Sequence, residues 1–236
     1  MVAQTSRALD RKEVESLVRE VLHQRLRGQL TPPPSQARSH TERGKGPNPL
    51  VVNVSARHMH VTPEDLAVLF GPGSKLTKMK DLYQQGEFAS EQLVTIVGPR
   101  QRIIPNVRIL GPERKFTQIE LSYTDGVYLG VDLPLRVSGD IDGTPGITVL
   151  GPKGALHLSK GVIRAARHVH MSTADMDFYG VKDGDHMKLK IDGPCGVTFD
   201  NLRVRYHPKV VLEVHIDTDE GNACDLDSAA RMELIK

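Results

Sequence analysis

Two kinds of hydrophobic pattern divide the chain, and each predicts a different type of structure. Near the N-terminus, apolar residues recur with the three- and four-residue spacing of one helix face: Val14, Leu17, Val18, Val21, Leu22 and Leu26. Asp10 is the expected N-cap of this helix, with Glu13 at the capping-box position. Most other positions are charged, so the pattern predicts an amphipathic helix within residues 1–27.

Residues 28–49 lack any comparable apolar pattern. They contain Pro32 to Pro34 and many serine, glycine, arginine and lysine residues, which is typical of a flexible linker. A helix on such a linker gains order only by burying its apolar face. We therefore expect it to bind a partner protein; the alternative is that it folds back onto the rest of the chain.

From residue 50 onward, short runs of Val, Ile and Leu alternate with polar residues and are separated by GP, DG and PG pairs. With 21 Gly and 15 Pro, this pattern predicts many short strands joined by turns. The expected fold class is mainly β, in a barrel or sandwich architecture. Short helices are expected at Thr62-x-x-Asp65 and Ser172-x-x-Asp175, which have the spacing of helix N-caps.

The β-rich part contains an internal repeat. The segment ARHMHVT from Ala56 recurs as ARHVHMS from Ala166, at an offset of 110 residues. Downstream, a strand containing Glu120 is similar to one containing His215. The sequence therefore predicts two versions of one unit, over residues 50–165 and 166–236, with Glu120 and His215 at equivalent positions.

The repeated segments carry residues that bind metal ions. In an extended strand, residues i and i+2 point to the same side, so each His-x-His motif presents two imidazoles together. Adding the equivalent downstream residue gives two candidate ligand sets: His58, His60 and Glu120 in one unit, and His168, His170 and His215 in the other. Three protein ligands with an open position are typical of catalytic zinc.

The motif is more informative because it occurs twice. A single His-x-His is usually an ordinary surface or core pair, but here four of the ten histidines lie in the two motifs. Arginines accompany both: Arg57, Arg108, Arg114 and Arg167. They favour an anionic substrate, because a guanidinium matches phosphate; a surface ion pair is the alternative for each. Arg114 is the favoured candidate, since it precedes the Glu120 strand.

Composition narrows the choice of function. The chain has 31 Lys and Arg against 29 Asp and Glu, which gives no basic field for nucleic acid. Two cysteines form neither a metal-binding pair nor a disulfide framework. No apolar run approaches the roughly 18 residues of a membrane span, and no secretory signal is evident. We expect an intracellular enzyme with small-molecule substrates.

Taken together, the chain resembles a known family. The two RHxH motifs, the GPERKFTQIELSYTD and EVHIDTDEGNA segments, and the N-terminal helix on its linker are similar to the PduL-type phosphotransacylases, or phosphate propanoyltransferases, of bacterial microcompartments. The resemblance implies two closed β-barrels with short capping helices, the second completed by the strand at 50–57. It also implies two zinc ions and acyl transfer between coenzyme A and phosphate, in propanediol degradation.

The resemblance also assigns roles to individual residues. It implies that Arg114 binds phosphate and that both ligand sets hold zinc. The implied coenzyme A contacts are Lys80, Arg108, Leu110, Ser138 and Asn222. The N-terminal helix resembles the peptides that direct such enzymes into the microcompartment lumen, and we expect a homo-oligomer.

Two other functions fit the same ligand pattern. A dinuclear zinc hydrolase of thioesters or phosphoesters would use the same ligands with a bridging hydroxide. A metal-stabilised scaffold that binds shell proteins would have closed coordination and no catalysis. Formation of acyl phosphate, dependent on added phosphate, separates the transferase from both.

Overall fold

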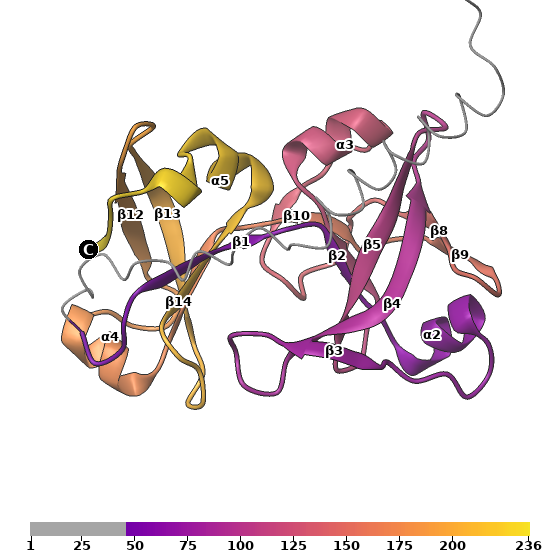
Figure 1. Ribbon diagram of the computed structural model, residues 1–236, viewed down its shortest axis with the longest axis horizontal. Helices are drawn as coiled ribbons and strands as arrows, with labels where there is room; N and C mark the ends of the chain where they lie inside the picture. Colours follow the sequence, from indigo (N-terminus) through magenta and orange to yellow (C-terminus); the bar gives the residue numbers. More distant parts are fainter. Residues whose placement is uncertain (1–45) are drawn as a thin grey trace, which may run out of the picture. The chain divides into compact units, whose positions relative to one another are not determined.

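The computed structural model describes residues 46–236, so the predicted helix within residues 1–27 and nearly all of the predicted linker lie outside the described range. The described part is mainly β, as predicted, and consists of two curled half-barrel sheets with short helices at their ends (Figure 1). The helices are α2 (Pro63–Phe70), α3 (Tyr123–Leu129), α4 (Thr173–Tyr179), α5 (Thr218–Ala223) and the 3-10 helix η1 (Leu226–Ser228). None of them is long and apolar enough to cross a membrane.

The first sheet contains the first His-x-His motif. Its strands, in hydrogen-bonded order, are β7 (Leu135–Arg136), β10 (Val162–Ala165), β6 (Gln118–Glu120), β2 (His58–His60), β5 (Ile103–Gly111), β4 (Phe88–Val97), β8 (Ile147–Leu150) and β9 (Ala155–Leu158). A further strand, β3 (Lys78–Asp81), pairs with β4.

The second sheet contains the second motif. Its order is β1 (Val51–Ser55), β14 (Glu213–Asp217), β11 (His168–Met171), β13 (Val197–Tyr206), β12 (His186–Asp192) and β15 (Arg231–Ile235). Within the described residues, no strand pairing joins the two ends of either sheet. Each sheet is therefore a curled half-barrel whose edge strands, in the described part of the chain, are not hydrogen-bonded to each other. The resemblance implied closed barrels.

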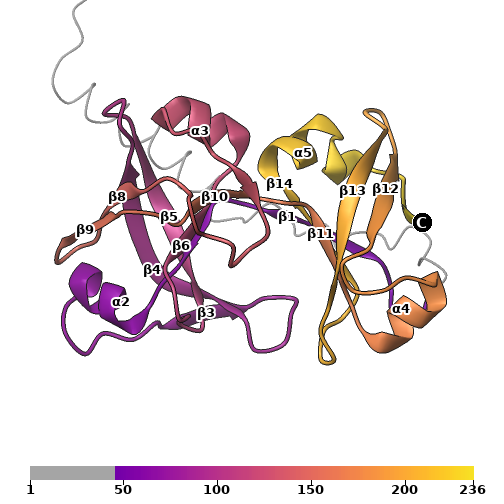
Figure 2. The same cartoon turned by 180° about the vertical axis from the view of Figure 1, so that it is seen from behind.

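The two sheets exchange strands reciprocally. β1 precedes the first motif in sequence but pairs in parallel with β14, so that Asn53 lies beside His215. β10 precedes the second motif but pairs in parallel with β6, so that Ile163 lies beside Glu120. Figures 1 and 2 show β1 and β10 running between the two sheets. The sequence reasoning anticipated only an exchange through residues 50–57; the return exchange through β10 is an addition.

Each sheet buries its own apolar face. Met59, Ile109 and Ile119 are fully buried in one cluster, and Val169 and Val214 in another. Because side chains alternate along a strand, the polar residues flanking these positions point away from the cores. The cores thus fix which way the histidines face.

Every ligand-bearing strand leads into a helix N-cap two residues after its last candidate ligand. The caps are Thr62, Ser122, Ser172 and Asp217, and each accepts a hydrogen bond from the backbone N–H three residues later. The predicted caps at Thr62 and Ser172 are confirmed. Such caps anchor the strand ends, since they satisfy N–H groups that a helix leaves unpaired.

Candidate functional site

The first triad consists of His58, His60 and Glu120. His58 lies opposite Glu120 in the antiparallel pairing of β2 with β6. The candidate ligand atoms of the three residues all lie within 4.8 Å of one another, and all three residues are buried. The structure therefore brings together the three residues that the sequence grouped.

The second triad consists of His168, His170 and His215, again with all candidate ligand atoms within 4.8 Å of one another. His168 lies opposite His215 in the antiparallel pairing of β11 with β14. The rings of these two residues stack with their centroids 4.9 Å apart. The second triad thus repeats the first with an imidazole in place of the Glu120 carboxylate.

Hydrogen bonding leaves one nitrogen of several rings available for a metal ion. Nδ1 of His58 lies 2.8 Å from the carbonyl of Ala56, and Nδ1 of His168 lies 2.9 Å from that of Ala166, so the tautomer with Nε2 unprotonated fits both. Nδ1 of His60 and Nε2 of His215 are buried with no hydrogen-bond partner among the described residues. A buried imidazole nitrogen that makes no hydrogen bond is available to a metal ion.

Burial also keeps three of these imidazoles neutral, which is the form that binds metal. Burial lowers the pKa of His60 to about 2, and the charges of His58 and Arg114 act in the same direction. Burial lowers the pKa of His170 to about 3, assisted by His215 and Arg205. The pKa of His168 is likewise held well below its ordinary value, mainly by burial. The donor set therefore fits zinc or a similar borderline metal.

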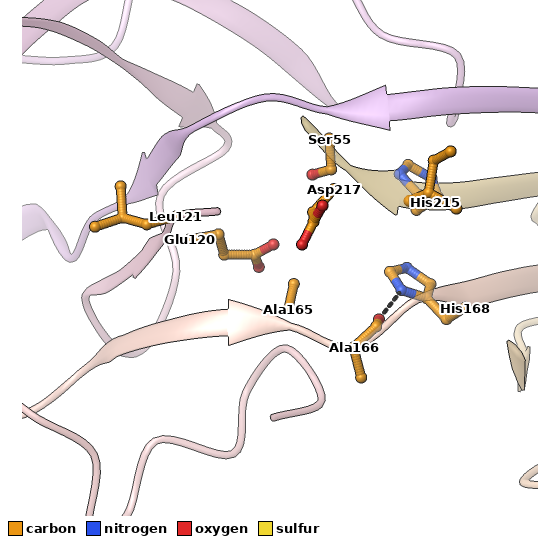
Figure 3. A pocket seen from close by; sticks show the side chains of 9 residues that line it. Ser55, Glu120, Leu121, Ala165, Ala166, His168, His215 and Asp217 are labelled. Carbon is orange, nitrogen blue, oxygen red and sulfur yellow. Dashed lines mark hydrogen bonds between the residues drawn. The ribbon is translucent and has the colours of Figure 1, made fainter. Parts of the chain in front are cut away.

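The strand exchange brings the triads to a common pocket. Glu120 of the first triad lines it together with His168 and His215 of the second. Ser55 at the end of β1 and Ala165 at the end of β10 line the same pocket, because both crossing segments pass it (Figure 3). Candidate ligands of both triads therefore border one pocket.

Two buried residues that the sequence reasoning did not single out adjoin the third ligands. Gln118 donates from Nε2 to Oε1 of Glu120 at 2.7 Å. Oε2 of Glu213 lies 3.1 Å from Nε2 of His215, although outside hydrogen-bond alignment. Burial acts to raise the pKa of Glu213, but neighbouring His215 and the amides of Asn53 and Gln84 outweigh burial and lower the pKa. The second triad thus has an ionised carboxylate beside it.

Two arginines lie near the triads, Arg114 on the loop between β5 and β6 and Arg205 on β13. The backbone N–H of Arg114 donates to Val61 at 2.9 Å, and its guanidinium lies 3.4 Å from Glu87 and 3.5 Å from the Ser138 hydroxyl. Arg205 lies beside His170 in the pairing of β11 with β13. Its guanidinium makes no hydrogen bond or ion pair within residues 46–236.

Arg205 interacts electrostatically with charged residues of the first unit as well as its own. Burial lowers the pKa of Arg205 below its ordinary range, and Arg114 acts in the same direction, while Glu120 and Glu87 oppose the shift. The sequence reasoning missed Arg205. The repeat could have found it, because the alignment of NVRIL from Asn106 with NLRVR from Asn201 puts Arg205 where the first unit has Leu110.

The arginines of the RHxH motifs have a structural role. Arg57 forms an ion pair with Asp125 at 3.2 Å, and Arg167 forms one with Glu220 at 2.6 Å. Asp125 and Glu220 are the capping-box carboxylates of α3 and α5. Each arginine therefore ties a His-x-His strand to the helix that follows the third ligand, which is the ion-pair alternative of the sequence analysis.

The residues expected to contact coenzyme A are more widely spread over the described residues than the two triads are. Arg108 lies beside His58 in the pairing of β2 with β5, and its guanidinium donates to the Ser90 carbonyl. Leu110 follows on β5, and Ser138 accepts a hydrogen bond from Gln118 at 2.9 Å. Lys80 on β3 and Asn222 on α5 are both exposed, with no hydrogen bond or ion pair to a triad within the described range.

Comparison with known proteins identifies the family. Residues 51–227 match the family model described as phosphate propanoyltransferase. A phosphate propanoyltransferase of Planctopirus limnophila is 55% identical over 229 residues, which cover 97% of this chain and 92% of the relative. One of Thermotoga maritima is 47% identical, covering 79% of this chain and 89% of the relative. One of Lachnoclostridium phytofermentans is 50% identical, covering 74% and 82%. The chain therefore belongs to the phosphate propanoyltransferase family, a family of phosphate acyltransferases.

Proposed function

We propose that this enzyme moves an acyl group, propionyl or acetyl, between coenzyme A and inorganic phosphate at a site holding two zinc ions. The observation that carries the proposal is that a member of this family has two three-residue clusters of candidate ligands, and that Glu120 of one and His168 and His215 of the other line one pocket. In the reaction, the carbon–sulfur bond of the thioester breaks and a carbon–oxygen bond to phosphate forms. The proton lost by phosphate ends on the released thiol.

The residues proposed to hold zinc are the two triads. When bound, zinc at such a site stabilises a thiol sulfur in its deprotonated form and offsets negative charge on a neighbouring oxygen. The chain contributes by keeping its imidazoles neutral through burial and by fixing the ligands at strand ends that lead directly into helix caps.

We assign phosphate binding to Arg114 together with Arg205. Arg114 is held in position by its backbone bond to Val61 and by Glu87, which leaves part of its guanidinium for an anion. Arg205 brings a second guanidinium from β13, with no hydrogen bond or ion pair to its neighbours in residues 46–236. Two like charges facing one region are stabilised by an anion between them, and guanidinium groups bind phosphate bidentately.

We also propose that coenzyme A contacts residues on β5, the Ser138 segment, β3 and α5. Arg108 and Leu110 lie on β5 beside the first triad, and Ser138 is linked to Glu120 through Gln118. Lys80 and Asn222 are exposed and available to the nucleotide part of the substrate. A long ligand that starts at the first triad and extends to the surface would contact residues of both kinds.

An assay for free thiol release from propionyl-CoA and acetyl-CoA tests this function. We expect release to depend on added phosphate, with acyl phosphate formed in equal amount and trapped as its hydroxamate. Thiol release at the same rate without phosphate would instead indicate a hydrolase. No release from either substrate by enzyme loaded with two zinc ions would reject both acyl transfer and hydrolysis of these thioesters.

We further propose that the segment before residue 28 directs the enzyme into the lumen of a bacterial microcompartment through shell or lumen proteins. The support is the apolar stripe from Val14 to Leu26 and an alignment with the Planctopirus limnophila relative that covers 97% of the chain. The same stripe favours self-association into a homo-oligomer.

Deletion of residues 1–27 tests the targeting role in cells that co-express shell proteins. The truncated enzyme should keep its turnover but lose co-localisation with shells. Replacing Leu17 and Val21 with glutamate should have the same effect, since it removes the apolar face and keeps the linker. Normal entry of the truncated enzyme into shells would disprove the role.

A further inference from the structure

Gln118 and Glu213 occupy equivalent positions beside the two triads. Gln118 lies opposite His60 in the pairing of β2 with β6, and Glu213 lies opposite His170 in the pairing of β11 with β14. Each is two residues before the third ligand of its triad. Gln118 is 0% exposed and Glu213 is 2% exposed, so neither side chain faces bulk water.

In each unit, either the third candidate ligand or its buried neighbour carries a carboxylate, but not both. In the first unit the ligand Glu120 carries the negative charge, and its neighbour Gln118 is a neutral amide. In the second unit the ligand His215 is an imidazole, and the carboxylate belongs to its neighbour Glu213, 3.1 Å from Nε2. Each unit therefore has one carboxylate within its pair.

The surroundings of Glu213 suit a permanently ionised group. The amide of Asn53 from β1 donates to one carboxylate oxygen, and the amide of Gln84 donates to the other. Gln84 also donates to the carbonyl of Val211 at 3.1 Å and accepts from its N–H at 3.3 Å. A buried carboxylate is costly unless donors and a nearby positive charge compensate it. The described residues provide the amide donors, and a cation at the second triad would provide the charge.

We propose that Glu213 is a positioning residue that supplies the second triad with the negative charge that Glu120 supplies to the first. Glu213 acts through His215 and through its proximity to the bound cation, and Gln118 is its neutral counterpart. This inference rests on the metal sites of the proposed function. It adds an acidic residue outside the six ligands and explains why one unit accepts a third imidazole where the other has a carboxylate.

The test compares zinc affinity between the wild type and three variants, by stepwise competition with a chromogenic chelator. Glu213→Gln should weaken the binding of one of two ions by about 10- to 100-fold, the usual cost of losing a partner that supports a metal ligand. Gln84→Met is the matched control, because it removes a hydrogen bond to Glu213 and keeps the charge; both ions should stay within a few-fold of wild-type affinity.

The third variant copies the first unit into the second. Glu213→Gln combined with His215→Glu recreates the Gln118–Glu120 pair, and it should recover at least tenfold of the affinity lost in Glu213→Gln. A purely structural role for Glu213 predicts no recovery. If Glu213→Gln fails to fold, the double variant decides alone: two bound ions support the proposal, and loss of the second ion overturns it.

The outcomes separate this inference from the proposed function. A wild-type enzyme that binds no zinc would reject the metal sites themselves. A wild-type enzyme with two ions and an unchanged Glu213→Gln variant would overturn only the role of Glu213. That role is also overturned if Gln84→Met weakens zinc binding as strongly as Glu213→Gln, since the effect would then come from lost packing.

Discussion

Nε2 of His58 lies 3.6 Å from Oε2 of Glu120, because the pairing of β2 with β6 sets the two residues directly opposite each other. The second unit uses the same register for His168 and His215. Opposed residues in a strand pair have their Cβ atoms about 5 Å apart, close enough for both side chains to reach one ion. The position of the third candidate ligand is therefore determined by strand register, and either a carboxylate or an imidazole fits there.

This relationship predicts the effect of changing Glu120. Glu120→His should retain two zinc ions per chain, since it makes the first triad chemically equal to the second. Glu120→Ala should lose one ion, because two histidines alone leave the site a ligand short. Metal content by elemental analysis checks both variants. Equal zinc content in the alanine variant and the wild type would remove Glu120 from the ligand set.

The paired arginines give a second prediction. Arg114→Ala and Arg205→Ala should each raise the Michaelis constant for phosphate by about tenfold or more, with a much smaller effect on that for acyl-CoA. Because both guanidinium groups would bind one anion, the double variant should show less than the sum of the two free-energy losses. Steady-state kinetics with each substrate varied in turn provide the values. Strictly additive losses would mean that the two arginines bind different groups.

The grouping of the candidate ligands followed from the sequence because the repeat itself supplied it. The strand around Glu120 aligns with the strand around His215, and alternation of apolar residues then assigns both to the polar face. The caps at Thr62 and Ser172 were predictable for a similar reason, since they depend on local spacing. Local spacing and the internal repeat were therefore sufficient to predict the candidate ligands and these helix caps.

What could not be predicted depends on long-range pairing. The partner of β10 is a strand more than 40 residues earlier, and nothing in residues 162–165 specifies it. Arg205 could not be assigned to the site because its position beside His170 depends on the register of β11 with β13. Glu213 read simply as a polar-face residue, and its burial depends on Gln84 arriving from the first unit. The role of Arg57 and Arg167 likewise required the positions of α3 and α5.

The ion pair of Arg167 with Glu220 predicts a loss of stability without a loss of phosphate binding. Arg167 donates to Glu220 from Nε at 2.8 Å and to the carbonyl of Asp200 at 2.9 Å. Arg167→Met would leave the partly buried carboxylate of Glu220 without its ion-pair partner, which typically costs about 1–3 kcal/mol. Urea denaturation should show this decrease, while the Michaelis constant for phosphate stays within about twofold. A larger change in that constant would return Arg167 to the anion site.

The buried histidines predict that the metal-free protein loses stability as pH falls below 6.5. The folded-state pKa of His60 is about 2 and that of His170 about 3, both below the ordinary 6.5 of an unfolded chain. Between these values the unfolded state binds protons that the folded state does not, so the free energy of unfolding decreases with falling pH, by about 1.4 kcal/mol per pH unit for each such group.

Urea denaturation between pH 6.5 and 5 isolates the effect, because most carboxylates stay ionised there. His60→Gln should reduce the slope by about one proton, whereas His157→Gln, at an exposed position on β9, should leave it unchanged. A wild-type slope near zero over this range would show that the imidazoles can be protonated without unfolding.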